Sequence, residues 1–343
     1  MVSILDRIGV GIIGCGEISK LHIRGYINLV KKAKIVAISD IIEERVRSFS
    51  EEFSVDKWYT DYEQLLKVED IDTVDICAPH NLHTEIVIKA LEAGKHVICE
   101  KPIALTLEEA DQMIRAAERA HKKLMIAHNL RFMAQFQKTK EIINKGTLGK
   151  LGLITINVRS GSAYESKNWR LSKKVSGGGA LMAEGIHFLD LLRWYVGEAD
   201  QVLGITEKVL DKEREVEDNA VILLRFKDGT HAYYVQSSTM KRPYPEWKIE
   251  ICGSKGSLVT DLKGELMIYS EELKQNFNGW FTNQHIGDQY ADSFRNEIEQ
   301  FIDCIKEDRT PPVTGEEGKA SLRLLLSVYK SAETNEWVKL STL

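Results

Sequence analysis

Lys101 stands at a position where its side chain could take up or release a proton in a reaction. Glu100-Lys101-Pro102 follows directly on the apolar run His96-Val97-Ile98-Cys99, which is typical of a buried strand. A lysine at the carboxyl end of a parallel strand lies where open α/β sheets bind their ligands, and the proline would fix the backbone that follows it. The triplet alone is equally compatible with a surface turn. The oxidation of a secondary alcohol needs a hydride acceptor and a base, and Lys101 is a candidate base.

A glycine-rich turn near the N-terminus could hold a dinucleotide. Gly11-Ile12-Ile13-Gly14-Cys15-Gly16 joins an apolar run to a helix-like segment. Gly14 permits a tight turn, and Gly16 lets the backbone approach a pyrophosphate at the helix N-terminus. The third glycine of the usual fingerprint is replaced by Ser19. We expect the cofactor to contact this turn and the start of the helix, at Gly14, Cys15, Gly16, Glu17 and Ile18.

An aspartate ends the second apolar run. A carboxylate at the position of Asp40 accepts hydrogen bonds from the ribose hydroxyls of NAD and repels the 2′-phosphate of NADP. Ile41 and Ile42 follow it, with no adjacent arginine. The sequence therefore favours NAD over NADP, although a strand could also simply end in a solvated aspartate.

These residues are positioned by alternating strands and helices in the first third of the chain. Short apolar runs separated by helices of 10–15 residues are typical of βαβ units and a parallel sheet. Gly94 is a helix stop, and Thr106 with Glu109 forms a capping box. Strands are predicted at 8–13, 35–39, 73–78, 96–99 and 123–127, and helices at 17–30, 43–53, from 83 to 94, and at 107–121.

The pattern changes after about Leu130. A helix over 134–145 leads into an alternating strand over 151–159, and three glycines at 177–179 precede a helix over 180–195. Strands then follow around 201–207, 218–226, 230–237, 247–252 and 257–261, two of them joined by the turn Lys227-Asp228-Gly229. We expect a Rossmann-type parallel sheet domain over 1–128. An α+β domain with an open-faced, mostly antiparallel sheet should span 129–343.

Taken together, the motifs resemble the glucose-fructose oxidoreductase/inositol dehydrogenase/MocA (Gfo/Idh/MocA) family over essentially the whole chain. Glu100-Lys101-Pro102 is the most specific of them. The glycine-rich turn, Ala78-Pro79-His80-Asn81-Leu82-His83 and Gly185-x-His187-x-x-Asp190 support it. The resemblance implies a Rossmann domain followed by a domain whose open sheet is used in oligomers.

The resemblance also implies roles for single residues. Lys101 would lie near the nicotinamide and the reacting hydroxyl, Glu100 would help to position it, and His187 would relay protons. A lone helical histidine can also be structural, and Asp190 can orient the imidazole or simply balance local charge. The loop near the nicotinamide would be formed by Ala78, Pro79, His80, Asn81 and His83, where Asn81 or His83 could instead open the next helix.

One position departs from the family pattern. Relatives that oxidise inositols often carry an aspartate four residues before the histidine, where this chain has Ala183. At about 100° per residue, the neighbouring Glu184 would lie about 60° from His187 and could contact a polyol. Sugars stack on aromatic rings and form hydrogen bonds with planar donors, so aromatic and arginine side chains after residue 130 are candidates for substrate contacts. The same side chains could instead serve packing alone. The substrate candidates are Arg131, Tyr164, Trp169, Arg170 and Glu184, together with Lys101 and His187.

Composition excludes several classes of function. A net charge of −5 gives no basic surface for nucleic acid, and the absence of long apolar runs predicts no membrane span. The five cysteines have no metal-like spacing, so we expect free thiols, no metal, and a reducing, cytoplasmic location.

The resulting hypothesis is an NAD-dependent oxidoreductase. It would transfer a hydride between a ring hydroxyl of a sugar, sugar derivative or cyclitol and the nicotinamide, as a homodimer or homotetramer. Two alternatives share the same fold: a glycoside hydrolase or lyase that retains its NAD, and a non-catalytic sensor of NAD or sugar. Lys101 and His187 argue against the sensor, which needs neither.

Overall fold

The computed structural model describes residues 7–161, 168–210, 214–239, 246–270, 280–282 and 289–343. The chain folds into two compact units, Met1–Asn129 with Ala291–Lys319, and Leu130–Tyr290 with Ala320–Leu343. The break near residue 129 is close to the predicted boundary. The segment 291–319, in contrast, packs with the first unit and not with the second. The reason is hydrophobic burial, because Ile298 and Ile302 of α9 (Gln289–Lys306) join the core of the first unit.

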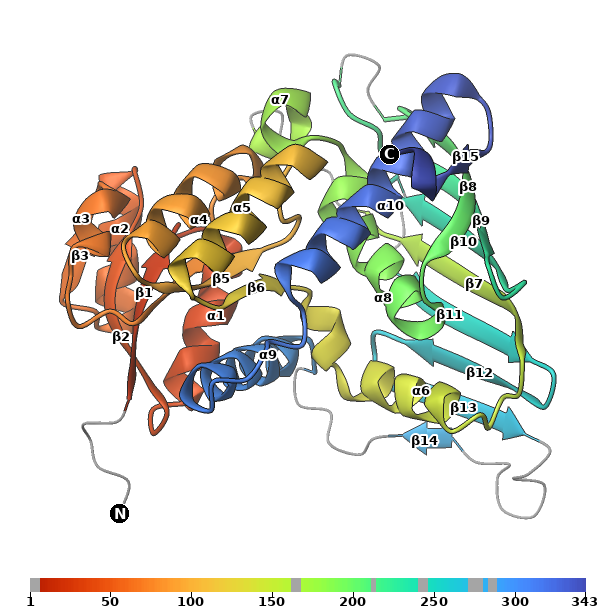
Figure 1. The fold of residues 1–343 in the computed structure, drawn as a ribbon, viewed down its shortest axis with the longest axis horizontal. Helices are drawn as coiled ribbons and strands as arrows, with labels where there is room; N and C mark the ends of the chain where they lie inside the picture. The colour runs from red at the N-terminus through yellow and green to blue at the C-terminus, as the bar shows by residue number, and fades with distance from the viewer. Residues whose placement is uncertain (1–6, 162–167, 211–213, 240–245, 271–279, 283–288) are drawn as a thin grey trace. The chain divides into compact units, whose positions relative to one another are not determined.

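A six-stranded parallel sheet forms the centre of the first unit, in the order β3-β2-β1-β4-β5-β6. This is the strand order of a dinucleotide-binding Rossmann fold. Its strands are β1 (Ile8–Ile13), β2 (Ala33–Ser39), β3 (Lys57–Tyr59), β4 (Thr73–Ile76), β5 (His96–Glu100) and β6 (Leu124–Ala127). Its helices are α1 (Glu17–Asn28), α2 (Glu43–Phe53), α3 (Tyr62–Leu66), α4 (His83–Glu92) and α5 (Leu107–Ala120), besides α9 (Figure 1).

The strands of this sheet are apolar because both faces are covered. Val10 and Ile12 of β1 are fully buried and pack with Ile23 of α1. Helix α5 begins at the predicted capping box, in which Thr106 and Glu109 exchange hydrogen bonds. In Figure 1, α4 and α5 lie side by side over the sheet. The loops that contain the candidate site residues follow the carboxyl ends of the strands.

The second unit is built on a nine-stranded sheet, in the order β14-β13-β12-β11-β7-β10-β9-β8-β15. Among the described strands, β10 pairs with β7 in parallel and the other neighbours are antiparallel. They are β7 (Leu151–Arg159), β8 (Ala199–Glu207), β9 (Asn219–Phe226), β10 (His231–Ser237), β11 (Glu246–Gly253), β12 (Gly256–Asp261), β13 (Glu265–Ser270), β14 (Trp280–Thr282) and β15 (Val338–Lys339). The helices of this part are α6 (Ala134–Asn144), α7 (Lys173–Ser176), α8 (Ile186–Val196) and α10 (Gly315–Thr334), the last of which begins in the first unit.

The two faces of this sheet differ. Inward side chains such as Ile154, Ile222 and Tyr234 are buried in a core with α6 and α8. Large apolar side chains on the opposite face stay exposed, with exposed fractions of 44% at Leu153, 55% at Ile205, 37% at Val221, 39% at Leu223 and 37% at Tyr233. We call these five residues the outer face. Val221 pairs with Ile205, and Leu223 pairs with Tyr233, so the apolar side chains are neighbours across strands.

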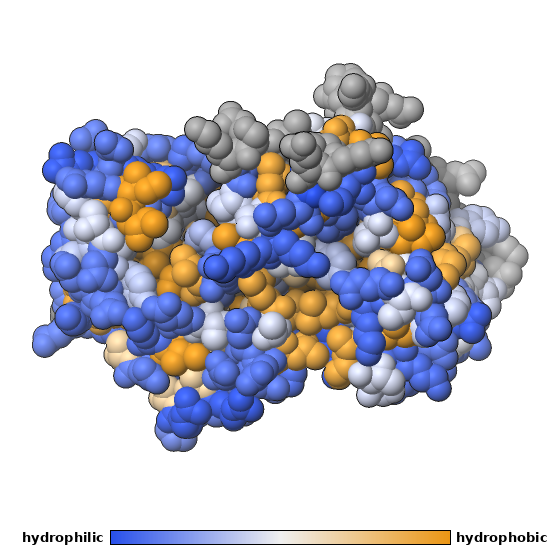
Figure 2. Space-filling model, turned by 90° about the horizontal axis from the view of Figure 1, so that it is seen from above, coloured by the Kyte–Doolittle hydropathy of each residue, from blue (hydrophilic) through white to orange (hydrophobic). Residues whose placement is uncertain are grey.

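The described helices include none that is long and apolar enough to cross a membrane. In the view of Figure 2, hydrophilic side chains dominate the surface, and apolar side chains gather in smaller groups between them.

Candidate active site

The predicted dinucleotide turn is formed at the carboxyl end of β1. Gly14 has a φ of +97°, and a side chain there would meet the Cys77 carbonyl oxygen at 2.5 Å. A Cβ on Gly16, in contrast, would point into open space. Among the described residues, no side chain caps α1, so the N–H groups of its first turn face the approach over Gly16. This arrangement fits a pyrophosphate, which binds where free N–H groups and the helix dipole point.

Asp40 follows β2 and is 8% exposed. Its Oδ2 accepts the backbone N–H of Cys15 at 2.8 Å, and its Oδ1 accepts that of Ile42 at 2.9 Å. The guanidinium of Arg45 lies 3.2 Å from Oδ2. An arginine is thus close in space although none is adjacent in sequence. The carboxylate is held in one orientation at the end of the strand, where a ribose would bind.

The loop after β4 contains the predicted nicotinamide residues. One of its buried members is His83, whose Nδ1 lies 2.8 Å from the Pro102 carbonyl oxygen and whose Nε2 lies 3.0 Å from the Ala78 carbonyl oxygen. Burial lowers the pKa of His83 although both carbonyl groups favour the charged ring. Asn81 is exposed, whereas His80 is buried. The His83 ring therefore joins the loops that follow β4 and β5.

Lys101 follows the last residue of β5 and is half-buried. The Lys101–Pro102 bond is cis. Glu100 is buried, and its Oε2 accepts the backbone N–H of Lys101 at 3.1 Å. Burial alone would raise the pKa of Glu100, but the hydrogen bond from His22 and the positive charge of Lys101 outweigh burial and lower that pKa. The first unit thus brings Lys101, Glu100, the loop at 78–83 and the glycine turn to one edge of one sheet.

His187 lies in the second unit, in the first turn of α8, and is 8% exposed. The preceding residues Leu181–Gly185 form a π-helical turn. A π turn holds more residues than an α turn, so the spacing of about 100° per residue does not apply between Ala183 or Glu184 and His187. Ala183 is buried and Glu184 is half-buried. π turns inserted in α-helices are frequent at functional sites.

Glu184 is held by two side chains that the sequence did not single out. Its Oε2 accepts Gln236 Nε2 at 3.1 Å and Ser160 Oγ at 3.4 Å. The Gln236 amide oxygen accepts the Tyr234 hydroxyl at 2.6 Å. Burial, followed by the charge of Glu184, raises the pKa of Tyr234 well above its usual value. Ser160, Gln236 and Glu184 therefore form a polar cluster beside the first turn of α8.

Arg131 forms a buried ion pair with Asp190. Its Nε and Nη2 each lie 2.7 Å from an Asp190 carboxylate oxygen, and the Ser321 hydroxyl donates to the same carboxylate at 2.7 Å. This bidentate pair ties α8 to the segment before α6. A structural role thus accounts for Asp190, and a substrate contact by Arg131 stays a prediction.

The three glycines before His187 are explained by close packing and by backbone conformation. A side chain on Gly178 would meet the Tyr329 hydroxyl at 2.0 Å, and one on Gly179 would meet the Glu217 carbonyl oxygen at 1.8 Å. Gly177 ends α7 with a φ of +80°. Gly178 and Gly179 are needed because the chain passes too close to its neighbours for a Cβ, and Gly177 because of its positive φ.

Two further substrate candidates, Trp169 and Arg170, lie in the 3₁₀ turn Trp169–Leu171 before α7. The Arg170 guanidinium lies over the Trp169 ring, 4.5 Å from its centroid, and Arg170 lines a pocket together with Arg214 and Ser238. Tyr164 lies outside the described residues.

Two sequence profiles of one family match this chain. The profile described as "Oxidoreductase family, NAD-binding Rossmann fold" matches residues 8–128, and that described as "Oxidoreductase family, C-terminal alpha/beta domain" matches residues 140–340. The chain belongs to the Gfo/Idh/MocA family. Its fold, a parallel Rossmann sheet followed by a mostly antiparallel sheet, is that of the family.

Curated relatives of this Gfo/Idh/MocA protein extend over nearly its full length. Myo-inositol 2-dehydrogenase of Thermotoga maritima is 33% identical over 336 residues, which cover 96% of this chain and 98% of the relative. D-glucoside 3-dehydrogenase of Escherichia coli is 27% identical and covers 96% and 97%.

Solved structures agree with this assignment. A probable dehydrogenase from Thermotoga maritima matches with a TM-score of 0.83 and 31% identity, covering 98% of this chain and all of that one. Levoglucosan dehydrogenase in complex with NADH and levoglucosan matches with a TM-score of 0.90 and 25% identity, covering 97% and 99%. The chain is an oxidoreductase with an NAD-binding Rossmann domain.

Proposed function

We propose that this protein oxidises a ring hydroxyl of a sugar, sugar derivative or cyclitol with NAD. The observation that carries the proposal is the position of Lys101, which follows β5 at the sheet edge where β1 ends in an uncapped cofactor turn. In parallel sheets of this order, ligands bind outside the carboxyl ends of the strands. The relatives are named as dehydrogenases of myo-inositol, of a D-glucoside and of levoglucosan, and these names support a small polyol as substrate.

The chemistry follows from what these side chains can do. NAD, when bound, supplies the hydride acceptor. Lys101 in its amine form takes the hydroxyl proton as the carbon loses its hydride, so the alcohol becomes a ketone and the lysine becomes an ammonium. In the reverse direction the ammonium returns that proton to the ketone oxygen. His187 is proposed to pass the proton between the substrate and solvent.

The proposed cofactor is NAD rather than NADP. The charge of Asp40 at the end of β2 favours ribose hydroxyls over a 2′-phosphate. The backbone N–H groups of Cys15 and Ile42 donate to the Asp40 carboxylate and hold it in this orientation. Arg45 is near but is already paired with the same carboxylate, so it partly offsets the repulsion without opening a phosphate site.

Substrate recognition is assigned to the polar cluster beside α8. Glu184 presents a carboxylate that Ser160 and Gln236 hold in place, and carboxylates bind vicinal hydroxyl groups by accepting their hydrogen bonds. Ala183 removes the second carboxylate that inositol-oxidising relatives often carry at that position. We therefore propose that the substrate differs from myo-inositol in the hydroxyl pattern around the reacting carbon.

The outer face is proposed to be covered by a second copy of the chain. Its five apolar residues lie on the neighbouring strands β7, β10, β9 and β8, where Tyr233 pairs with Leu223 and Val221 with Ile205. Exposed apolar surface of this kind marks an interaction site in soluble proteins.

A substrate screen tests the proposal. The protein is incubated with NAD and a panel of cyclitols, sugars, glycosides and nucleotide sugars, and NADH fluorescence is followed. Oxidation of a polyol by the wild type, lost in Lys101→Ala, is the expected result. Glycoside cleavage without net NADH would instead favour a hydrolase or lyase with retained NAD.

A further inference from the structure

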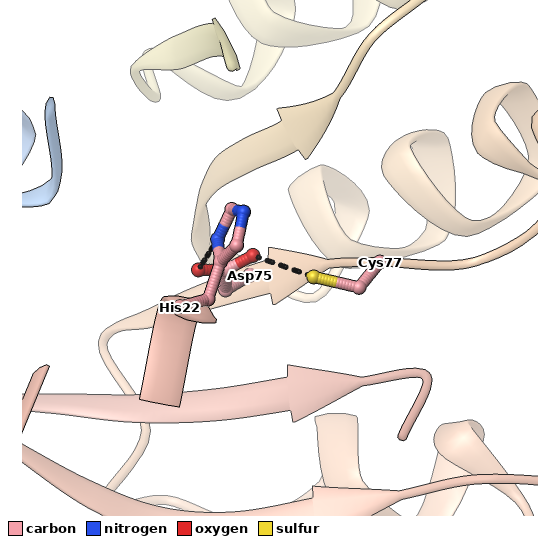
Figure 3. A group of neighbouring side chains, drawn as sticks. All are labelled: His22, Asp75 and Cys77. Carbon is pink, nitrogen blue, oxygen red and sulfur yellow. Dashed lines mark hydrogen bonds and ion pairs between the residues drawn. The ribbon is translucent and has the colours of Figure 1, made fainter. Parts of the chain in front are cut away.

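A buried histidine in α1 lies between two buried carboxylates. The Nδ1 of His22 is 2.8 Å from Asp75 Oδ2, and its Nε2 is 3.1 Å from Glu100 Oε1. His22 and Asp75 are fully buried, and Glu100 is 7% exposed. Figure 3 shows the His22 ring above β4, with Asp75 between it and Cys77. Three ionisable groups from α1, β4 and β5 thus meet inside the first unit.

The geometry is that of a hydrogen-bonded cluster and not of a metal centre. Asp75 uses one oxygen for His22 and the other for the Cys77 thiol, which donates at 3.5 Å. Two ligands of a tetrahedral ion with bonds of about 2.0 Å would be about 3.3 Å apart, so the 2.8 Å between Nδ1 and Oδ2 is too short for a shared ion. Burial raises the pKa of the Cys77 thiol well above its usual value, in keeping with a protonated thiol that donates to Asp75.

Both nitrogens of His22 face carboxylate oxygens, and a ring that is protonated on both nitrogens can donate to each of them. Burial opposes the charged ring, but Asp75 and Glu100 outweigh burial and raise the pKa of His22 well above its usual value. Other buried groups lie around this cluster. The ring centroid of Phe294 in α9 is 5.1 Å from that of His22. Tyr26 and Cys77 lie near Asp75, Cys99 lies near both carboxylates, and Glu297 lies near Tyr26.

The cluster extends to the lysine. Glu100 accepts His22 through Oε1 and the Lys101 backbone N–H through Oε2, so one carboxylate bridges the two residues. His22 itself lies on α1, which begins at the turn proposed to hold the cofactor. A line of hydrogen bonds therefore runs from the cofactor helix to the backbone of Lys101.

We propose that His22 is a positioning residue for Lys101: its two N–H groups fix the Asp75 and Glu100 carboxylates, and Glu100 in turn fixes the lysine at the end of β5. The assignment rests on the proposed function only insofar as Lys101 is the base. The cluster also sets the charge behind Lys101, because one cation separates two anions. Loss of the cation leaves excess negative charge near the ammonium, and loss of Glu100 removes negative charge.

This opposite effect on charge gives a test that needs no substrate. Full-length protein is reductively methylated with ¹³C, and the Lys101 signal, identified by its loss in Lys101→Arg, is titrated by NMR. We expect His22→Gln to move the Lys101 midpoint to higher pH, Glu100→Gln to move it to lower pH, and His22→Lys, which keeps a cation, to stay near the wild type. His121→Asn, at an exposed helix end, is the matched control. Unchanged midpoints in both His22→Gln and Glu100→Gln would overturn the proposal.

A second readout separates positioning from mere stability. In kinetics on a substrate from the screen, His22→Gln should lower kcat about ten- to hundredfold, the size expected of a misplaced catalytic group, while the Kd for NAD stays within a few-fold. His22→Lys should restore part of kcat. If His22→Gln does not fold, ¹⁵N NMR of the wild-type imidazole decides, and a neutral ring at pH 7 overturns the proposal. A wild type that oxidises nothing on the panel rejects the proposed function, while the Lys101 titration still tests His22.

Discussion

The backbone N–H of Cys15 donates to the Asp40 carboxylate over 2.8 Å, which joins the glycine turn after β1 to the end of β2. The two residues lie 25 positions apart, and both are buried. Asp40 thus shapes the turn that would receive the pyrophosphate as well as the place where the ribose would bind. A change at Asp40 that removes this acceptor oxygen consequently affects both parts of the proposed cofactor site.

The first prediction concerns cofactor preference. We expect the wild type to bind NAD at least about tenfold better than NADP, or ~1.4 kcal/mol, because the Asp40 charge repels a 2′-phosphate. Asp40→Ser with Ile41→Arg should narrow or reverse this difference, helped by release of Arg45 from its carboxylate partner. Asp40→Asn is the control, since its amide oxygen can still accept the Cys15 N–H without the charge. Fluorescence titration measures each Kd, and equal wild-type affinities would reject the role of Asp40.

The second prediction concerns Lys101. Lys101→Ala should lower kcat by roughly 10²–10⁴, the usual size of a general acid–base contribution. The Kd for NAD should stay within a few-fold, because the lysine is not part of the turn that would hold the pyrophosphate. Lys101→Arg keeps a cation but cannot act as a base, so it should be nearly as slow. Normal turnover in either variant would remove Lys101 from the mechanism.

Much of the first unit could be predicted from its sequence, because buried parallel strands are short continuous apolar runs. The strand Ile8–Ile13 and the helix Glu43–Phe53 were predicted with the bounds that the structure has. Strand β3 escaped prediction because it has three residues at the sheet edge and is only partly buried. Strands β13, β14 and β15 and helices α3, α9 and α10 were also not predicted. The return of α9 to the first unit depends on tertiary packing that no local pattern contains.

The candidate site was predicted only in part, for a similar reason. Lys101, Asp40 and His187 stand in recognisable local motifs. The polar cluster around Glu184 takes Ser160 and Gln236 from chain segments 24 and 52 residues away, and nothing near either residue indicates it. Asp75 did offer a signal, since a charge inside a buried apolar strand is costly unless it is paired. That signal leads to His22 only once the fold brings α1 onto the sheet.

The third prediction concerns assembly. We expect the wild type to be a dimer or tetramer at micromolar concentration, because association would bury the outer face. The double variant Val221→Glu with Leu223→Glu should be largely monomeric in light scattering, with an unchanged far-UV circular dichroism spectrum. Val30→Glu, at an exposed apolar residue of the first unit, is the matched control and should assemble normally. A monomeric wild type would contradict the prediction.

The fourth prediction concerns stability in acid. Burial, aided by Lys122 and Lys123, lowers the pKa of His96 to about 4, and its Nδ1 accepts the Lys123 N–H at 3.0 Å. As the pH falls below about 6.5, His96 becomes protonated in the unfolded chain. In the folded chain it becomes protonated only near pH 4, so the unfolded chain binds more protons between these two values. The free energy of unfolding should therefore fall with pH in this range.

His96→Asn isolates this effect, because asparagine can accept the same hydrogen bond and does not titrate. Between pH 7 and pH 5 the wild type should lose more unfolding free energy than the variant, as measured by urea denaturation. Equal losses in the two proteins would show that His96 does not carry the effect.

The last prediction separates the roles of Glu184 and His187. If Glu184 binds substrate hydroxyls, Glu184→Gln should mainly raise KM, because glutamine keeps an oxygen for Gln236 and Ser160 but loses the charge. If His187 relays protons, His187→Asn should mainly lower kcat. We therefore expect the shift that Glu184→Gln causes in the basic limb of the pH profile of kcat/KM to be smaller than the decrease that His187→Asn causes in kcat.

Ser160→Ala is the control for the cluster, and should raise KM less than Glu184→Gln because Gln236 still holds the carboxylate. A Glu184→Gln enzyme that loses about a thousandfold in kcat at unchanged KM would show that the carboxylate acts in the transition state. Because Ala183 removes the neighbouring acid, no second carboxylate on this turn could mask that result.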